Sequence, residues 1–599
     1  MCGIAGILKK TPPKDALEFK TMASSLKAMQ NALLHRGPDS KGAYFSPCQQ
    51  AALSHTRLAI IDLSPAGHQP MSLDDGRYTI TFNGEIYNHK KLRAELEENG
   101  ETFTTDSDTE VILKLYINKG EKCVQNLRGM FAFMIWDNDR KTGFAARDGF
   151  GIKPFYYRSK DNCLVFSSEL RALLASGLST QHISSRGVKS YLLRGSVSES
   201  DTIIRDVKML PAGSFLTWKE GSIKIKRYWT LKFKPKEYSQ EKAIEVTRTA
   251  LEQTVRAHLV SDVPVGIFLS GGIDSTALVA LASRLSREKI NTYSIAFEDP
   301  LWNEGEIAKK VAGHFGTNHT EFLMTAELAR PLFKSFLNTV DQPTIDGFNS
   351  YCVSRLASQK GEKVVLSGLG GDELFAGYKS FQVIPRMLQK SGYVKYLHFL
   401  IKPLIAQFNR KLTPVRRRIA DALLEPKSVA IAHQSLRGIF SQSESQALAE
   451  SICGKPPRPL KMHEPHHSTL ADTISDLELT TYMRNQLLRD SDSASMAWGL
   501  ELRVPFVDRV LFEQVSSIPA SIRLAQGKTL LINSVPEIPQ WVVERPKQGF
   551  RFPFDEWFSE EWKDMPLPDT PQWIELTPWY RRWSLLVLNN WISRYVKPG

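Results

Sequence analysis

The segment from residue 263 to residue 282 constrains the fold of this chain more than any other. An apolar run of strand length leads into the turn Ser-Gly-Gly-Ile-Asp-Ser-Thr, and an Ala/Leu-rich run of helical length follows. This order aims backbone N–H groups and a helix N-terminus at one point, which suits a phosphate group. The segment therefore predicts an α/β domain that binds phosphate at the end of a strand.

The residue types in this turn fit that chemistry. Gly271 and Gly272 let the backbone approach a ligand closely, and Ser270 and Ser275 add hydroxyl donors. Asp274 cannot bind phosphate directly but can hold a magnesium ion that does. No lysine follows the glycines, so this is not the loop of P-loop NTPases. The pattern resembles the pyrophosphate loop of enzymes that adenylate a substrate; the alternative is an ordinary glycine-rich turn.

A second strand with a glycine-rich turn occurs at residues 363–378. The turn reads Ser-Gly-Leu-Gly-Gly-Asp-Glu and contains a pair of acidic residues. We expect Ser367 and Gly368 to contact a nucleotide. We expect Asp372 to be a second magnesium ligand, opposite Asp274.

The remainder of the second half alternates strand-like and helix-like runs, for example a helix from about residue 239 to 257 and a strand at 291–297. This alternation predicts a doubly wound parallel sheet, which binds its nucleotide at the carboxyl ends of the strands. Leu269, Ile295 and Phe297 lie at the ends of these strands, so they are the candidates to flank an adenine.

The bulk properties set the class of protein. A chain of 599 residues is too long for one core, so two or more domains are expected. The six cysteines lack CxxC and CxxH spacing, which argues against a zinc site or disulfide framework and indicates a reducing compartment. Residues 1–30 lack the apolar core of a signal peptide, and residues 393–408 are too short and too charged to span a bilayer. We expect a cytoplasmic protein with no membrane span.

The net charge of +13 raises the question of an acidic partner. Much of the excess lies in residues 386–427, where Asp421 and Glu425 are the only acidic residues. This basic stretch is interpreted either as a solvated helical face or as a contact with an acidic partner or anionic surface. No nucleic-acid partner is expected.

The chain begins Met-Cys-Gly-Ile-Ala-Gly-Ile. Removal of Met1 is expected to leave Cys2 with a free α-amine. An α-amine has a pKa of about 7.7–8.0, so it can serve near neutral pH as the base for the thiol of the same residue. The alternative is an ordinary buried cysteine.

Four further motifs accompany this cysteine. They are His-Arg-Gly-Pro-Asp at 35–39, Ser-His-Thr-Arg-Leu at 54–58, Phe-Asn-Gly-Glu-Ile at 82–86 and Ser-Asp-Thr-Glu at 107–110. The set resembles the glutaminase domain of the class II glutamine amidotransferases, which are N-terminal-nucleophile (Ntn) hydrolases with a four-layer αββα fold. The resemblance spans nearly all of residues 2–215.

This resemblance implies a role for each matching residue. Cys2 would attack the side-chain amide of glutamine, and Asn83 with the Gly84 N–H would form the oxyanion hole. Arg57 would bind the α-carboxylate as a bidentate pair, and two acidic residues would take the α-ammonium. The expected glutamine-binding residues are Arg57, Ile61, Asn83, Gly84, Glu85 and Asp108.

A glutaminase domain followed by SGGIDS, SGLGGDE, GLELRVPF and RPKQGF resembles the glutamine-hydrolysing asparagine synthetases. The resemblance implies a glutaminase domain at 2–215, a linker at 216–238 and a pyrophosphate-loop (PP-loop) synthetase domain with helical additions at 239–599. It also implies an ATP-dependent amide ligase that uses Mg²⁺, forms an acyl-adenylate and receives ammonia through an internal apolar passage. Lys547 would be the cation aimed at the α-phosphate. The expected ATP-binding residues are Leu269, Ser270, Gly271, Gly272, Asp274, Ser275, Phe297, Ser367 and Gly368.

Two positions depart from the best-known bacterial members of this family. Leu369 stands where they have a glutamate tied to the acceptor site, and Asp346 stands near the place of an acceptor-binding arginine. Arg489 and Arg503 are the candidates to replace that arginine. The expected acceptor is aspartate, or another small carboxylate of a polysaccharide or natural-product pathway. The sequence leaves open whether the protein forms a homodimer.

Three other classes fit less well. A tRNA-modifying enzyme with the same loop would explain the positive charge but would not carry a glutaminase domain. Phosphosugar amidotransferases share the first domain but lack SGGIDS. A non-catalytic scaffold would have no reason to combine the six residues Cys2, Arg57, Asn83, Asp108, Asp274 and Asp372.

Overall fold

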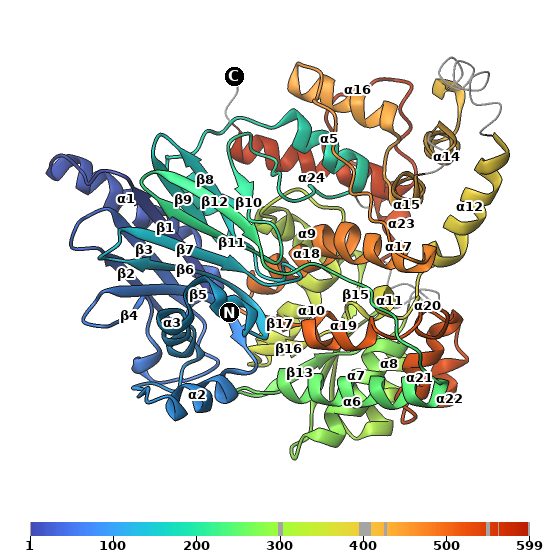
Figure 1. Cartoon of the computed structure of the whole chain (residues 1–599). Coiled ribbons are helices and arrows are strands. Elements are labelled where there is room, and N and C mark those ends of the chain that lie inside the picture. Colours follow the sequence, from blue (N-terminus) through green and yellow to red (C-terminus); the bar gives the residue numbers. More distant parts are fainter. Residues whose placement is uncertain are drawn as a thin grey trace.

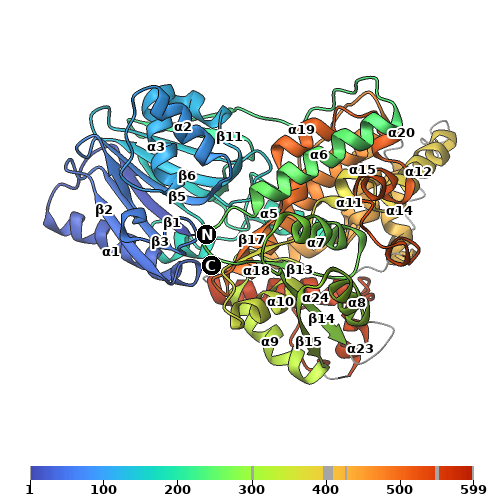
Figure 2. The ribbon, with the colours of Figure 1, turned by 90° about the horizontal axis from the view of Figure 1, so that it is seen from below.

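The computed structural model describes residues 2–297, 303–394, 409–424, 428–546, 552–560 and 562–596. Its first domain is built on two stacked six-stranded antiparallel sheets, with orders β10-β8-β9-β1-β3-β2 and β12-β11-β7-β6-β5-β4. Helix α1 covers the outer face of the first sheet, and α2 and α3 cover that of the second (Figure 2). The elements are α1 (Ala16–Ala32), α2 (His89–Glu98), α3 (Asp108–Lys119), β1 (Gly3–Lys9), β2 (Ser40–Phe45), β3 (Ala51–Arg57), β4 (Met71–Leu73), β5 (Tyr78–Ile86), β6 (Gly129–Asp137), β7 (Thr142–Arg147), β8 (Tyr156–Lys160), β9 (Cys163–Ser167), β10 (Lys208–Met209), β11 (Ser214–Lys219) and β12 (Ser222–Arg227).

Alternating side chains explain these four layers. On β1, Ile4 and Leu8 face the core between the two sheets, whereas Ala5 and Ile7 face α1. Strand β6 divides its side chains in the same way between the inter-sheet core and the layer of α2 and α3. Both faces of each sheet are therefore buried, which the period of two along a strand allows. The predicted αββα architecture is confirmed.

Strands β11 and β12 carry the second sheet beyond the boundary that the sequence predicted. Strand β11 pairs with β7 and crosses residue 215, and β12 pairs with β11 inside the segment predicted as a linker. A tight turn at Gly221, with φ of 82°, joins the two strands. The sheet of the first domain thus extends to Arg227.

The second domain contains a five-stranded parallel sheet of order β15-β14-β13-β16-β17 (Figure 1). Its strands are β13 (Val265–Phe268), β14 (Asn291–Phe297), β15 (Asn318–Met324), β16 (Val364–Leu366) and β17 (Glu501–Arg503). Helices α6 (Gln240–His258), α7 (Ile273–Leu285), α8 (Gly305–Phe315) and α10 (Phe348–Gln359) belong to the same unit. The expected strand at 291–297 is β14, and the expected helix from about residue 239 is α6, with Ser239 as its N-cap.

Helical additions complete the second domain. They include α9 (Ala326–Thr339), α12 (Ser380–Val394), α14 (Pro414–Leu424), α15 (Val429–Arg437), α16 (Gln442–Cys453), α17 (Leu470–Leu477), a π-helical segment Glu478–Leu488, α18 (Arg489–Met496), α23 (Phe554–Ser559) and α24 (Trp579–Tyr595). In the described part of the basic stretch, Arg417 is buried and pairs with Glu444 at 2.5 Å. That arginine therefore supports the fold rather than a solvated face. Across the described residues, no helix is long and apolar enough to cross a membrane.

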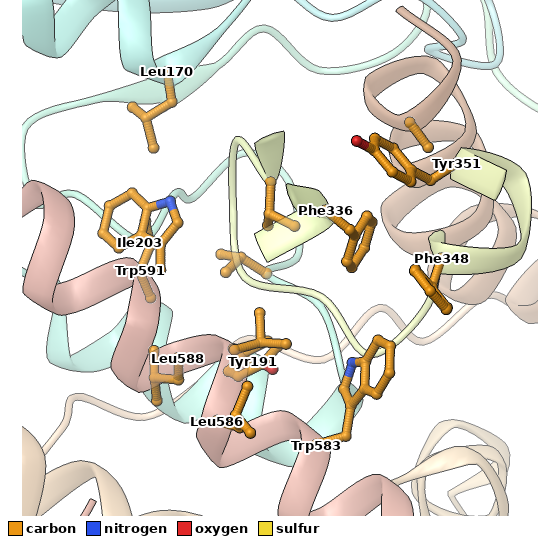
Figure 3. Packing of buried hydrophobic residues seen from close by; sticks show 14 of the residues in the cluster. Leu170, Tyr191, Ile203, Phe336, Phe348, Tyr351, Trp583, Leu586, Leu588 and Trp591 are labelled. Atoms are coloured by element: carbon orange, nitrogen blue, oxygen red, sulfur yellow. The ribbon is translucent and has the colours of Figure 1, made fainter. Parts of the chain in front are cut away.

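The two domains share one apolar core around α24. Figure 3 shows Trp583 and Trp591 of this helix near Leu170 and Tyr191 of the first domain, and all four belong to one buried cluster. The Tyr191 hydroxyl donates to the Ser584 carbonyl oxygen at 2.8 Å. This continuous core fixes the domains relative to each other, because separating them would expose apolar area.

Candidate functional site

Cys2 lies immediately before β1, at the domain interface. Its backbone nitrogen donates to Asn83 Oδ1 at 3.0 Å, and its thiol lies 4.0 Å from the Leu58 carbonyl oxygen. Burial raises the pKa of the thiol. Arg36 donates to the Cys2 carbonyl oxygen at 3.1 Å and pairs with Asp492 of the second domain at 2.9 Å. The cysteine backbone is thus anchored to both domains.

Asn83 and Gly84 lie next to one another on β5. The Asn83 Nδ2 donor is buried and has no hydrogen-bond partner among the described residues, although its Oδ1 is engaged. An unpaired buried donor beside a nucleophile is suited to a developing oxyanion. Gly84 has φ of 149°, and a Cβ there would lie 2.0 Å from the Met130 carbonyl oxygen. Only glycine permits this close approach.

Arg57 ends β3 and is held by backbone carbonyls. It donates to Ser64 O at 2.9 Å, to Ile61 O at 3.5 Å and to Asp62 O. Among the described residues, no carboxylate forms an ion pair with this guanidinium. A fixed, buried cation without a counter-ion matches the α-carboxylate of an amino acid.

Glu85 and Asp108 lie close to each other in the same part of the first domain. Asp108 begins α3 and accepts from the Ile86 amide at 2.9 Å. Burial, together with the nearby Glu501 and Asp108, raises the pKa of Glu85 well above its usual value. Burial also raises the pKa of Asp108. Two crowded carboxyls of this kind would bind an ammonium group.

Strand β17 of the second domain reaches this group of residues. Arg503 lies 3.7 Å from Glu85 and 2.6 Å from Glu501, and it also donates to two carbonyls at the end of α6. The carbonyl oxygen of Arg503 accepts from the Ser367 amide at 2.9 Å. One strand therefore contacts the predicted glutamine site and the second glycine-rich loop. Arg503, one of the two candidates for the acceptor arginine, thus lies beside Glu85 of the predicted glutamine site.

The first glycine-rich turn joins β13, the central strand, to α7. Ser270 and Ser275 hydroxyls lie 3.1 Å apart, and the Gly272 amide donates to Ser270 Oγ at 3.4 Å. Gly272 is the N-cap of α7. The turn thus has the predicted strand–turn–helix geometry, with α7 amides directed toward the turn.

The second turn closes directly onto the first. A Cβ at Gly371 would lie 2.4 Å from Asp274 Oδ1, so glycine is required there. Asp274 and Asp372 both contact the Lys528 ammonium, with an Nζ–Oδ2 distance of 2.5 Å to Asp274. Burial alone would lower the pKa of Lys528. The two carboxylates together have the larger effect, so the pKa of Lys528 is raised. The two predicted metal ligands do converge on one point.

These residues fit a magnesium ion. Within the described ranges, no group of three or more His, Cys, Asp or Glu residues forms a complete metal site. Mg²⁺ is commonly bound by one or two carboxylates plus substrate phosphates. Asp274 and Asp372 would supply those carboxylates. The ammonium group of Lys528 contacts both of them, which shows that a positive charge is accommodated between the two.

The other predicted nucleotide residues lie at the carboxyl ends of strands of the same sheet. Ser367 and Gly368 follow β16, and Leu269 follows β13. Phe297 ends β14, is buried, and packs edge-on against Phe552 with ring centroids 5.1 Å apart. The predicted α-phosphate cation, Lys547, lies outside the described residues.

Leu369 and Asp346 lie in apolar and acidic surroundings respectively. Leu369 packs against the core of the second domain. Burial raises the pKa of Asp346, and that of the nearby Asp490 to about 7. Arg489 lies 3.7 Å from Asp490 and also donates to Val197 O at 3.2 Å. Of the two candidate arginines, Arg489 is the one beside Asp346.

A small cavity, of about 20 Å³, lies beside this acidic pair. Its lining includes Arg36, Glu169, Asp346, Arg489 and Asp490. Arg36, which donates to the Cys2 carbonyl oxygen, belongs to the part of the wall that the first domain supplies, and Asp346, Arg489 and Asp490 belong to the part that the second domain supplies.

Comparisons with known proteins agree with this division. Residues 1–229 match the family model described as a glutamine amidotransferase domain, and residues 246–566 match asparagine synthase. Asparagine synthetase 1 (glutamine-hydrolysing) of Bacillus subtilis is 34% identical over 591 residues, covering 94% of this chain and 88% of the relative. Asparagine synthetase 3 of the same organism is 30% identical, covering 88% and 83%. Asparagine synthetase B of Escherichia coli is 33% identical over 404 residues, covering 64% and 66%.

The site and these matches define a glutamine-dependent amidotransferase joined to a pyrophosphate-loop synthetase. The chain belongs to the glutamine-hydrolysing asparagine synthetase family.

Three residues of the site escaped the sequence analysis. Lys528 sits in an unremarkable Gln-Gly-Lys stretch, Asp490 lies in a polar helix, and Glu501 precedes the predicted motif arginine. The residues next to Lys528 form no motif that assigns it to the site, because its partners Asp274 and Asp372 lie far away in the sequence.

Proposed function

We propose that this enzyme makes asparagine from aspartate, with glutamine as nitrogen donor and ATP as activator. Support for this proposal comes from β17, which contacts the glutamine-site carboxylates on one side and the nucleotide loop on the other. The family membership supplies the reaction class. Activation is needed because a carboxylate is a poor electrophile for ammonia.

In the first domain, the Cys2 thiol attacks the side-chain amide of glutamine, and the α-amine of Cys2 accepts the thiol proton. Asn83 Nδ2 and the Gly84 N–H stabilise the oxyanion. Collapse releases ammonia and leaves a thioester, which water hydrolyses to glutamate. Arg57 binds the α-carboxylate, and Glu85 with Asp108 binds the α-ammonium.

In the second domain, the acceptor carboxylate attacks the α-phosphate of ATP and pyrophosphate leaves. Ser270, Ser275 and the α7 amides hold the departing pyrophosphate. Mg²⁺, when held by Asp274 and Asp372, supplies charge neutralisation. Ammonia then attacks the acyl-adenylate, forming the amide and releasing AMP.

Ammonia must pass between the sites without becoming ammonium in bulk water. The small cavity whose wall includes Arg36 of the first domain and Asp346 and Asp490 of the second is our candidate for part of this route.

The acceptor is tested with ammonia as donor, which bypasses the glutaminase. We expect asparagine to form from aspartate, ATP and ammonia with a KM for aspartate of about 1 mM or below. Mass spectrometry of the amide product identifies the acceptor. If saturating aspartate yields no asparagine while glutaminase activity persists, the acceptor is a different carboxylate, as Leu369 and Asp346 would allow.

Substitution Arg57→Gln is expected to raise the KM for glutamine by about 10- to 100-fold, because a charge-assisted pair with the α-carboxylate is lost. Steady-state glutaminase assays measure this change. Arg57→Lys retains the charge but not the planar fork, so its effect should be intermediate. Ammonia-dependent synthesis should be unchanged in both variants; a parallel loss there would mean that Arg57 has a structural role instead.

A further inference from the structure

A second cavity, of about 320 Å³, lies between the domains and apart from both reaction sites. Its first-domain wall includes Arg194 at the end of α5 (Ser185–Arg194) and Arg227 at the end of β12. Its second-domain wall includes Lys461 and, from the π-helical segment, Arg484. Among the described residues that line it, none belongs to the predicted glutamine site or to the pyrophosphate loop. We refer to it as the interdomain cavity; α5 and α17, which contribute Arg194 and Leu477 to its wall, are labelled in Figure 1.

The interdomain cavity carries excess positive charge. Its four permanent cations face two carboxylates, Glu199 and Asp476. Glu199 already pairs with Arg147 at 2.9 Å and with Arg484 at 3.2 Å. Asp476 is contacted by two histidine side chains at 3.1 and 2.7 Å. With the histidines neutral, two positive charges remain uncompensated in the wall.

Arg194 is a largely buried cation whose side-chain partners are all neutral. It donates to Gln434 Oε1 at 2.7 Å and to Ser198 Oγ at 2.6 Å, and it contacts Met462 Sδ at 2.8 Å. All three partners are neutral, and among the described residues no carboxylate lies within ion-pair distance of Arg194. Burial lowers the pKa of this guanidinium to about 10. A cation held only by neutral groups is costly, so an anion in the cavity would be stabilising.

We propose that the interdomain cavity binds a small phosphate monoester, with its phosphate held by Arg194, Lys461 and Arg484. Two uncompensated positive charges match a phosphate dianion. The planar guanidinium forks match the geometry of its oxygens. The volume falls within the range of small-molecule pockets. Trp229 and Leu477, which also line the cavity, offer apolar surface to the organic part of the ligand.

Such a ligand would join the two domains, because its binding residues come from both. It would bind the docked arrangement and not separated domains, so it should also raise the midpoint of thermal unfolding. Neither the glutamine chemistry nor the adenylation step requires this ligand.

The test uses the full-length protein titrated with glycerol 3-phosphate at low ionic strength, measured by isothermal titration calorimetry. We expect saturable binding that weakens about tenfold or more in Arg194→Gln and in Lys461→Glu. The matched control is Arg186→Gln on the same helix, since Arg186 pairs with Asp201 at 2.8 Å and does not line the cavity. Its affinity should equal that of the wild type.

Two outcomes would overturn the proposal. The first is an absence of binding to the wild type. The second is equal affinity in all variants, which would place the phosphate at the pyrophosphate loop or on the general surface. Glutaminase activity reports whether each variant is folded. If Arg194→Gln does not fold, Lys461→Glu decides the matter, because Lys461 is an exposed residue.

Discussion

Replacing Cys2 with alanine is expected to abolish glutamine-dependent synthesis, by at least about 1,000-fold in kcat/KM, because the nucleophile is lost. Ammonia-dependent synthesis should persist, because Cys2 lies in the first domain and the turns that would bind ATP lie in the second. The measurement is amide formation with glutamine or with ammonium chloride as the alternative donor.

Cys123→Ala is the matched control for this substitution. Cys123 is also a buried, free cysteine of the first domain, and it lies in the apolar core beneath the second sheet. Its loss should affect stability but neither reaction. Equal loss of both donor activities in Cys2→Ala would contradict the division of labour between two sites.

Asp274→Asn is expected to stop both synthetic routes, by about 100-fold or more, while glutamine hydrolysis continues. The substitution removes one of the two carboxylates that converge beside Lys528, and both routes need adenylation. Acceptor-dependent release of pyrophosphate is the direct measurement. Raising the Mg²⁺ concentration should restore part of the activity if the carboxylate holds the metal.

The neighbouring helix α8 offers a control for this charge change. Glu306 is exposed and lies in the first turn of α8, as Asp274 lies in the first turn of α7. Glu306→Gln therefore removes a carboxylate from the start of a helix that does not follow a glycine-rich turn. Its activity should equal that of the wild type. Normal pyrophosphate release in Asp274→Asn would remove Asp274 from the magnesium site.

Local sequence patterns predicted the local structure well. Ser239 caps α6, the strand at 291–297 is β14, and the turn after β13 leads into a helix as expected, because each depends on neighbouring residues. Pairing across long sequence distances was not predictable from pattern. Lys528 lies 254 positions from Asp274, and nothing in its neighbours indicates that the fold brings them together.

The acceptor region shows the same limit. Leu369 and Asp346 were recognised as departures only by comparison with a family, whereas the raised pKa of Asp490 arises from burial and from Asp346. Burial is a property of the folded chain, so the raised pKa of Asp490 could not be predicted from its position in a polar helical sequence. The boundary at residue 215 missed β12 because the Pro-Ala-Gly sequence at 211–213 resembles the end of a domain, whereas the sheet continues through β11 and β12.

The position of Arg503 limits how the gene for this protein could be split or recombined. A first domain expressed alone would keep Glu85 and Asp108 together but lose both Arg503, which lies beside Glu85, and Glu501, whose charge helps to raise the pKa of both carboxyls. Glu501 has the larger influence of the two, so the pKa of both carboxyls would fall and the pH dependence of ammonium binding would change. A chimera that takes its second half from a paralogue should therefore keep the pH dependence of glutamine hydrolysis only if the donor sequence carries both the glutamate and the arginine at these positions of its last strand.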